Sequence, residues 1–139
     1  MPKMSPRGCA RSTILRLSWP DVKKRVLIVE DDPAVRQIVR VLLERDGIEV
    51  DIAEDGERAT ALLAQHSYAA VLLDLLMPRL DGRGVIAFMK ERALETPVVV
   101  LTAAADSADL DPQLVRVVLQ KPFEARELRK VVSAVLEMV

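Results

Sequence analysis

The sequence predicts an α/β domain in which helices cover both faces of a parallel, five-stranded sheet. Short apolar runs, such as RVLIV at 25–29 and VVVLT at 98–102, have the length and composition of strands buried on both faces. Between such runs, apolar residues recur every three to four positions, as in amphipathic helices. The chain has 139 residues, half of them apolar, so we expect one domain with a core of ordinary size.

The first part of the domain is predicted to form a strand, a helix and a second strand. After the strand at 25–29, Pro33 takes a favourable first helical position and Asp32 is the expected N-cap. Gly47 ends this helix. The residues at helical spacing between them are Val35, Ile38, Val39 and Leu42. In residues 48–52, Ile and Val alternate with acids, so this strand is expected at an exposed edge of the sheet.

The alternation of helices and strands continues to the end of the chain. Asp55-Gly56 and Asp81-Gly82 supply turn chemistry between elements. The predicted elements are a helix with Ala59, Leu62 and Leu63, a strand at 69–74, a helix with Val85, Ile86 and Met89, a strand at 98–102, a weak helix near Asp109–Val115, a strand at 117–119 and a helix at Glu124–Met138. Such alternation is typical of a parallel sheet.

The charge distribution separates the N-terminal segment from the rest of the chain. Residues 1–25 hold seven Lys or Arg and one Asp, whereas residues 26–139 hold thirteen basic and twenty acidic residues. We therefore expect a basic, flexible extension at 1–24 and an acidic domain at 25–139, which argues against direct nucleic-acid binding. No apolar run in the sequence has the length of a membrane span, and Cys9 is the only cysteine, so a cytoplasmic protein is expected.

Polar residues follow the predicted strands at the edge where the carboxyl ends of parallel strands meet. They are Glu30 and Asp31 after the first strand, Asp74 at the end of the third, Thr102 at the end of the fourth and Lys121 after the fifth. Ligands of open parallel sheets bind at this edge. Like charges about 4 Å apart cost roughly 4 kcal/mol per pair at an effective dielectric near 20, so clustered carboxylates favour bound cations. Lys121 supplies one positive charge, and Mg²⁺, which prefers oxygen ligands, would supply two more.

Asp74 is the candidate nucleophile because it stands alone at the end of its strand. A carboxylate beside Mg²⁺ and a lysine can attack a phosphoryl group and form an acyl phosphate. A purely structural ion-pair network would also account for the charged residues, Glu30, Asp31, Asp74 and Lys121, but it would not require Thr102 or a shared edge.

The motifs that contain these residues resemble those of a known family. VLIVEDDP, VLLDLLMPRLDG, VVLTA and QKPF, in this order and at these spacings, are similar to the receiver domain of two-component response regulators over about residues 24–139. The resemblance implies a flavodoxin-like, doubly wound sheet of strand order 2-1-3-4-5 with five helices. It also implies that Asp74 is the phosphoacceptor, and that Mg²⁺ is held by Glu30, Asp31, Asp74 and the backbone carbonyl of Leu76.

The resemblance assigns roles to two more positions. Thr102 matches the hydroxyl that turns toward the phosphoryl group, and Lys121 matches the lysine that binds the phosphoryl oxygens. The peptide bond between Lys121 and Pro122 is expected to be cis. The sequence departs from the family at Val118, where members usually carry Tyr or Phe coupled to the Thr, and in the short stretch between Thr102 and Lys121.

By this resemblance the chain is a single-domain response regulator, a phosphoacceptor switch rather than an enzyme. A sensor histidine kinase or phosphotransfer protein would donate the phosphoryl group, and the signal would pass to an unidentified downstream protein, with dimerisation left open. Leu76 and Ala104 are apolar at positions that influence attack by water, so slow self-dephosphorylation is expected. Two alternatives are a phosphorylation-independent interaction module of the same fold and an aspartate-nucleophile phosphatase. The second is disfavoured because Asp74 is followed by LLMP, with no acid two residues on.

Overall fold

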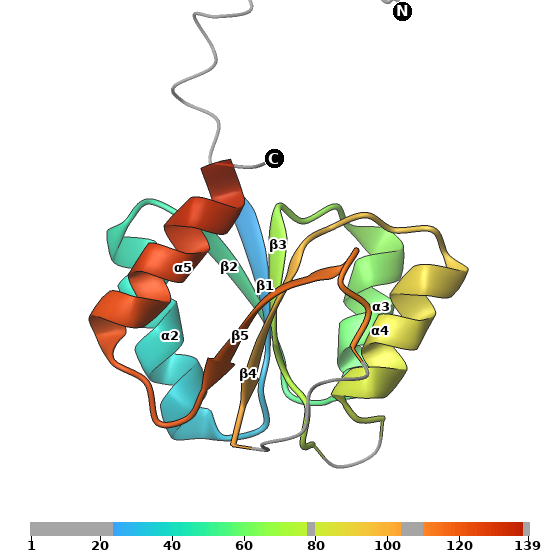
Figure 1. Ribbon diagram of the computed structural model, residues 1–139, viewed down its shortest axis with the longest axis horizontal. Helices are drawn as coiled ribbons and strands as arrows, with labels where there is room; N and C mark the ends of the chain where they lie inside the picture. Colours follow the sequence, from blue (N-terminus) through green and yellow to red (C-terminus); the bar gives the residue numbers. More distant parts are fainter. Residues whose placement is uncertain (1–23, 78–79, 104–109, 138–139) are drawn as a thin grey trace, which may run out of the picture.

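A computed structural model describes residues 24–77, 80–103 and 110–137 and shows a parallel, five-stranded sheet between two layers of helices (Figure 1). The strands are β1 (Arg25–Val29), β2 (Glu49–Ala53), β3 (Ala70–Asp74), β4 (Val98–Thr102) and β5 (Val115–Gln120). The helices are α2 (Pro33–Arg45), α3 (Gly56–Gln65), α4 (Gly82–Glu91) and α5 (Ala125–Glu137). The strand order is β2-β1-β3-β4-β5, and all neighbours are parallel, which confirms the predicted flavodoxin-like sheet.

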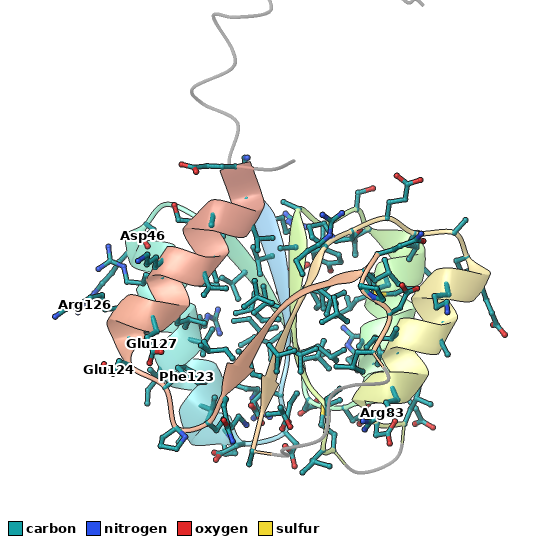
Figure 2. All side chains as sticks on the ribbon, in the orientation of Figure 1. Asp46, Arg83, Phe123, Glu124, Arg126 and Glu127 are labelled. Atoms are coloured by element: carbon teal, nitrogen blue, oxygen red, sulfur yellow. The ribbon has the colours of Figure 1, made fainter. Side chains whose placement is uncertain are left out.

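Helices α2 and α5 cover one face of the sheet, and α3 and α4 cover the other (Figure 1). Strand β1 contributes to both resulting cores. Leu27 and Val29 pack into the core beneath α3 and α4, whereas Val26 and Ile28 pack into the core beneath α2 and α5. All four side chains are fully buried, and side chains fill the space on both faces of the sheet (Figure 2). The continuous apolar run of this strand follows from burial on both sides.

Strand β2 lies at an edge of the sheet, as its alternating sequence predicts. Val50 and Ile52 pack, partly buried, against the core beneath α2 and α5. Asp51 lies between them in the sequence and accepts a hydrogen bond from the Tyr68 hydroxyl at 2.7 Å. One side of this strand is therefore covered by apolar packing, and the other meets polar groups.

The predicted weak helix near Asp109–Val115 is wrong in the part of this segment that the structure describes, from residue 110 onward. Asp111 instead begins a turn, in which its carboxylate accepts the N–H of Gln113 at 2.9 Å. The Asp111 carbonyl oxygen accepts the N–H groups of Leu114 and Val115 at 3.2 and 2.8 Å. Strand β5 already begins at Val115, so the segment is too short for a helix. The described residues hold four α-helices, not the five expected.

Contacts near the chain ends tie α5 to its neighbours. The expected extension lies outside the described residues except for Lys24, whose Nζ donates to the Leu136 carbonyl oxygen at 2.6 Å. Asp46, at the end of α2, lies beside α5 (Figure 2), and its carboxylate accepts from the Arg129 guanidinium at 2.8 and 3.1 Å.

Among the described residues, no helix has the length and apolar character that crossing a membrane requires.

Three aspartates begin the helices that follow β1, β2 and β3. Each accepts a hydrogen bond from a backbone N–H of the first helical turn, which satisfies a donor that the helix leaves unpaired. The pairs are Asp32 with Ala34 at 2.9 Å, Asp55 with Arg58 at 2.8 Å and Asp81 with Gly84 at 3.1 Å. The predicted N-cap role of Asp32 is confirmed, and the two residues interpreted as turn formers cap helices as well.

Gly82 allows α4 to begin against the backbone that follows β3. A Cβ at this position would lie 2.6 Å from the Asp74 carbonyl oxygen and 2.7 Å from the Leu75 Cα. Backbone atoms cannot move aside as a side-chain end can, so we expect Gly82→Ala to lower the free energy of unfolding by about 2–3 kcal/mol in chemical denaturation. Gly84→Ala is the control, since its Cβ would first meet side-chain atoms of Leu80. Equal losses in the two variants would contradict this explanation.

Candidate functional site

The carboxyl ends of β1, β3, β4 and β5 lie at one edge of the sheet (Figure 1), and the predicted site residues lie there. Glu30 follows β1, Asp74 ends β3, Thr102 ends β4 and Lys121 follows β5. Glu30 and Thr102 are 0% exposed and Asp74 is 4% exposed. These three are the buried polar or charged residues of the described part of the chain. The burial of polar groups is thus concentrated at the edge where ligands of such sheets bind.

Lys121 lies between two buried carboxylates. Its Nζ is 2.6 Å from Glu30 Oε1 and 3.4 Å from Asp74 Oδ2. The Lys121 side chain is partly exposed, whereas both acids are almost fully shielded from solvent. The lysine therefore offsets part of the charge repulsion between the acids, and its side chain stays partly open to solvent.

The remaining oxygens of the two buried acids accept backbone hydrogen bonds. Asp74 Oδ1 accepts the N–H of Leu76 at 3.1 Å, and Glu30 Oε2 accepts the N–H of Asp32 at 3.2 Å. Each carboxylate is thus fixed at one oxygen by the loop after its strand and at the other by Lys121. Leu76 lies two residues after Asp74 and is 56% exposed.

The ends of β4 and β5 complete the edge. Thr102 pairs with Gln120 in the sheet, and its carbonyl oxygen accepts the N–H of Lys121 at 2.8 Å. The peptide bond between Lys121 and Pro122 is cis, as the family resemblance implies. Val118, where the family usually has an aromatic residue, lies in β5 with 40% of its surface exposed.

Burial and neighbouring charges shift the pKa values of Glu30 and Lys121. The pKa of Glu30 is raised to about 7, chiefly by burial and also by Asp74, although hydrogen bonds from Lys121 and the Asp32 N–H offset part of this increase. Burial opposes the positive charge of Lys121, but its contacts with Glu30 and Asp74 outweigh this and raise the Lys121 pKa. Lys121 therefore stays protonated, and Glu30 takes up a proton near neutral pH.

Three acids form a group that could hold a metal ion. One carboxylate oxygen from each of Glu30, Asp31 and Asp74 lies within 4.8 Å of the others. Asp31 is exposed, so the group opens to solvent on one side. Carboxylate oxygens with room for water match the preference of Mg²⁺. The donor set therefore fits the cation that the sequence predicted.

Arg36 also belongs to this site, and sequence reasoning missed it. Its Nη1 donates to the carbonyl oxygens of Glu30 and Asp31 at 3.1 and 3.2 Å. An arginine in the first turns of a surface helix is too common to indicate such a role from sequence. Its place five and six residues after the two acids is not by itself a signal of this contact.

The chain matches the family model of the response regulator receiver domain over residues 26–133. The probable transcriptional regulator ycf27 of Guillardia theta is 37% identical, and the match covers 84% of this chain and 46% of that protein. This chain spans about half the length of the curated relatives it matches.

Solved structures show the same architecture. The Francisella response regulator 1452 receiver domain superposes with a TM-score of 0.77 at 27% identity, covering 84% of this chain and 98% of that one. The response regulator TrrA of Thermotoga maritima, in complex with Mg²⁺ and BeF, gives a TM-score of 0.73 at 30% identity and covers 81% of this chain and 98% of that one.

Proposed function

The chain belongs to the family of response regulator receiver domains, and on this basis we propose that Asp74 accepts a phosphoryl group from a histidine kinase or phosphotransfer protein. The observation that carries the proposal is the buried Asp74 carboxylate, with Oδ2 3.4 Å from Lys121 Nζ. An ion pair with Lys121 alone would not require the exposed Asp31 in the same group of acids. A site for a phosphoryl group and a cation accounts for all three residues.

The proposed reaction is a direct transfer. A carboxylate oxygen of Asp74 forms a bond to phosphorus while the bond from phosphorus to the donor's histidine nitrogen breaks, and the nitrogen keeps the electron pair. Lys121 is placed to bind the phosphoryl oxygens because its ammonium group is already beside Asp74. Mg²⁺, held by Glu30, Asp31, Asp74 and the Leu76 backbone carbonyl, would offset the negative charge of the phosphoryl group.

The output we propose is a contact with another protein made by the domain at residues 25–139, with residues 1–24 as an N-terminal extension. The acyl phosphate adds negative charge at a buried edge, and the Thr102 hydroxyl would turn toward it. Because Thr102 ends β4 and pairs with β5, its movement would change the surface that those two strands present. The protein then acts as a phosphoacceptor switch rather than as an enzyme.

Beryllofluoride, which mimics a phosphoryl group on aspartate, tests the site directly. We expect Mg²⁺ with beryllofluoride to raise the melting temperature of the chain, because a ligand that binds only the folded state stabilises that state. At a ligand concentration of a hundred times its Kd, the free energy of unfolding increases by about 2.7 kcal/mol. EDTA should abolish the increase, and Na⁺ at matched ionic strength is the control. A melting temperature that does not respond would contradict the proposal.

One observation favours the phosphorylation-independent interaction module as a second candidate. Val118 is an exposed valine rather than an aromatic residue, so the usual side chain that couples Thr102 to the surface is missing. The same melting assay separates the two functions. A module that acts without phosphorylation would show no increase in melting temperature with Mg²⁺ and beryllofluoride that depends on Asp74.

Leu76 is expected to slow the loss of the phosphoryl group. Its exposed side chain lies two residues after Asp74 and offers no hydrogen bond to an attacking water. We expect Leu76→Asn to release phosphate several-fold faster, because an amide can orient the water. A time course of phosphate release from the phosphorylated protein measures this. Leu76→Met, which stays apolar, is the control, and a Leu76→Asn rate no faster than the parent would refute the prediction. Ala104, the other apolar position, lies outside the described residues.

A further inference from the structure

The acidic turn between β1 and α2 is held by the guanidinium of Arg36. Arg36 lies in the first turns of α2 and is partly buried. Its Nη1 donates to two successive carbonyl oxygens, those of Glu30 at 3.1 Å and Asp31 at 3.2 Å. One donor group thereby fixes the direction of the two peptide units on either side of the Asp31 Cα.

The orientation of the Asp31 carboxylate depends on the backbone more than the orientations of the Glu30 and Asp74 carboxylates do. The Glu30 carboxylate is held by Lys121 and by the Asp32 N–H, and the Asp74 carboxylate is held by Lys121 and the Leu76 N–H. Among the described residues, the Asp31 carboxylate has no hydrogen-bond or salt-bridge partner, and the residue is exposed. The direction in which Asp31 presents its oxygens is therefore set by the peptide units that Arg36 fixes.

We propose that Arg36 is a positioning residue for the metal site, orienting Asp31 toward the cation through the two carbonyl oxygens. This proposal rests on the proposed function, since it assumes that Asp31 binds Mg²⁺. Arg36 does not touch the cation or the phosphoryl group. Groups that orient metal ligands typically change metal affinity by 10- to 100-fold when removed.

The charge of Arg36 and its positioning of Asp31 predict opposite effects on Mg²⁺ affinity when Arg36 is replaced, so an experiment can distinguish them. Removing a positive charge next to three carboxylates should strengthen the binding of a cation if electrostatic repulsion is all that Arg36 contributes. Removing the hydrogen bonds that orient Asp31 should weaken the binding. The structure favours the second effect, because both contacts of Arg36 at this turn are made to carbonyl oxygens rather than to carboxylates.

Isothermal titration of the full chain with MgCl₂, well below the melting temperature, tests the proposal. We expect Arg36→Met to weaken Mg²⁺ binding by about 10-fold. Arg40→Met is the matched control, since Arg40 lies one turn further along α2, is exposed and contacts Glu44 at 3.3 Å. This variant loses the same charge without loosening the turn and should bind as the parent does. Unchanged or tighter binding in Arg36→Met would overturn the proposal.

Two further variants separate positioning from a general loss of stability and from failure of the site itself. Val39→Ala removes a fully buried side chain from α2 without touching the acidic turn, and it should destabilise the chain while Mg²⁺ affinity stays unchanged. Weakened binding in Val39→Ala equal to that in Arg36→Met would overturn the positioning role. Asp31→Asn should abolish most binding. A parent that binds no Mg²⁺ would overturn the metal site and this proposal together, whereas a loss in Asp31→Asn without one in Arg36→Met would overturn the proposal alone.

Discussion

Replacing Asp74 with asparagine is expected to abolish phosphoryl acceptance and, in the absence of divalent cations, to stabilise the fold. The amide oxygen can still accept the Leu76 N–H, so the loop after β3 keeps its hydrogen bond. The amide cannot form an acyl phosphate, because it lacks the carboxylate nucleophile. It also removes a negative charge from a group in which three carboxylates approach within 4.8 Å. At an effective dielectric near 20, removal of this repulsion should exceed the lost attraction of Lys121 and stabilise the metal-free chain by about 1–2 kcal/mol.

Two measurements on Asp74→Asn check these effects separately. Incorporation of labelled phosphate from acetyl phosphate with Mg²⁺ should fall to background, and the melting temperature in EDTA should rise. Asp81→Asn is the matched control: it removes a carboxylate from the next helix start, and asparagine caps helices as well as aspartate does. This variant should be labelled like the parent. Labelling that survives in Asp74→Asn would place the phosphoacceptor elsewhere, and a lower melting temperature would show that Lys121 attraction outweighs the repulsion.

The sheet was predictable because each buried strand carries its evidence in consecutive residues. β1 and β4 are continuously apolar since helices cover both faces, and the alternating sequence of β2 reflects its place at the edge. The site was predictable for a related reason. Parallel strands bring their carboxyl ends to one edge, so residues after different strands converge without any local signal.

The helix near Asp109–Val115 was wrongly predicted and the role of Arg36 was missed for the opposite reason. Both depend on contacts that the local sequence does not display. The segment near Asp109–Val115 predicts a weak helix, but Asp111 accepts hydrogen bonds from the N–H groups of Gln113 and Leu114, which make a turn that leads directly into β5. Arg36 has the composition of an exposed helix residue. Its role appears only when the preceding carbonyl oxygens are seen to point toward its guanidinium.

Replacing Lys121 with methionine is expected to be the most destabilising change at the site. Glu30 would then be fully buried beside Asp74 without its cationic partner, which is 2.6 Å away in the parent. Breaking a buried ion pair by removing one partner typically costs 3–5 kcal/mol, and we expect about 3 kcal/mol at pH 8 because Lys121 is itself partly exposed. The direct measurement is the free energy of unfolding by urea, in the absence of divalent cations.

The loss in Lys121→Met should depend on pH in a defined direction. The Glu30 pKa of about 7 lies above that of an unfolded glutamate, so between the two values the folded state binds more protons and stability falls as pH rises. Without Lys121 the Glu30 pKa rises further, and this fall extends to higher pH. The difference in stability between parent and variant should therefore be larger at pH 8 than at pH 5, where Glu30 is protonated in both.

A second substitution shows whether the buried charge is the cause of that loss. Glu30→Gln keeps an acceptor for the Asp32 N–H but carries no charge, so the pair of changes Glu30→Gln and Lys121→Met should unfold at higher urea concentration than Lys121→Met alone. If the loss instead comes from the apolar stem of Lys121 and its packing, the second substitution recovers nothing and the pH dependence is absent. Recovery of stability in the double variant would mean that the buried carboxylates at this edge of the sheet are stable only beside a cation. A site for Mg²⁺ and a phosphoryl group imposes the same condition.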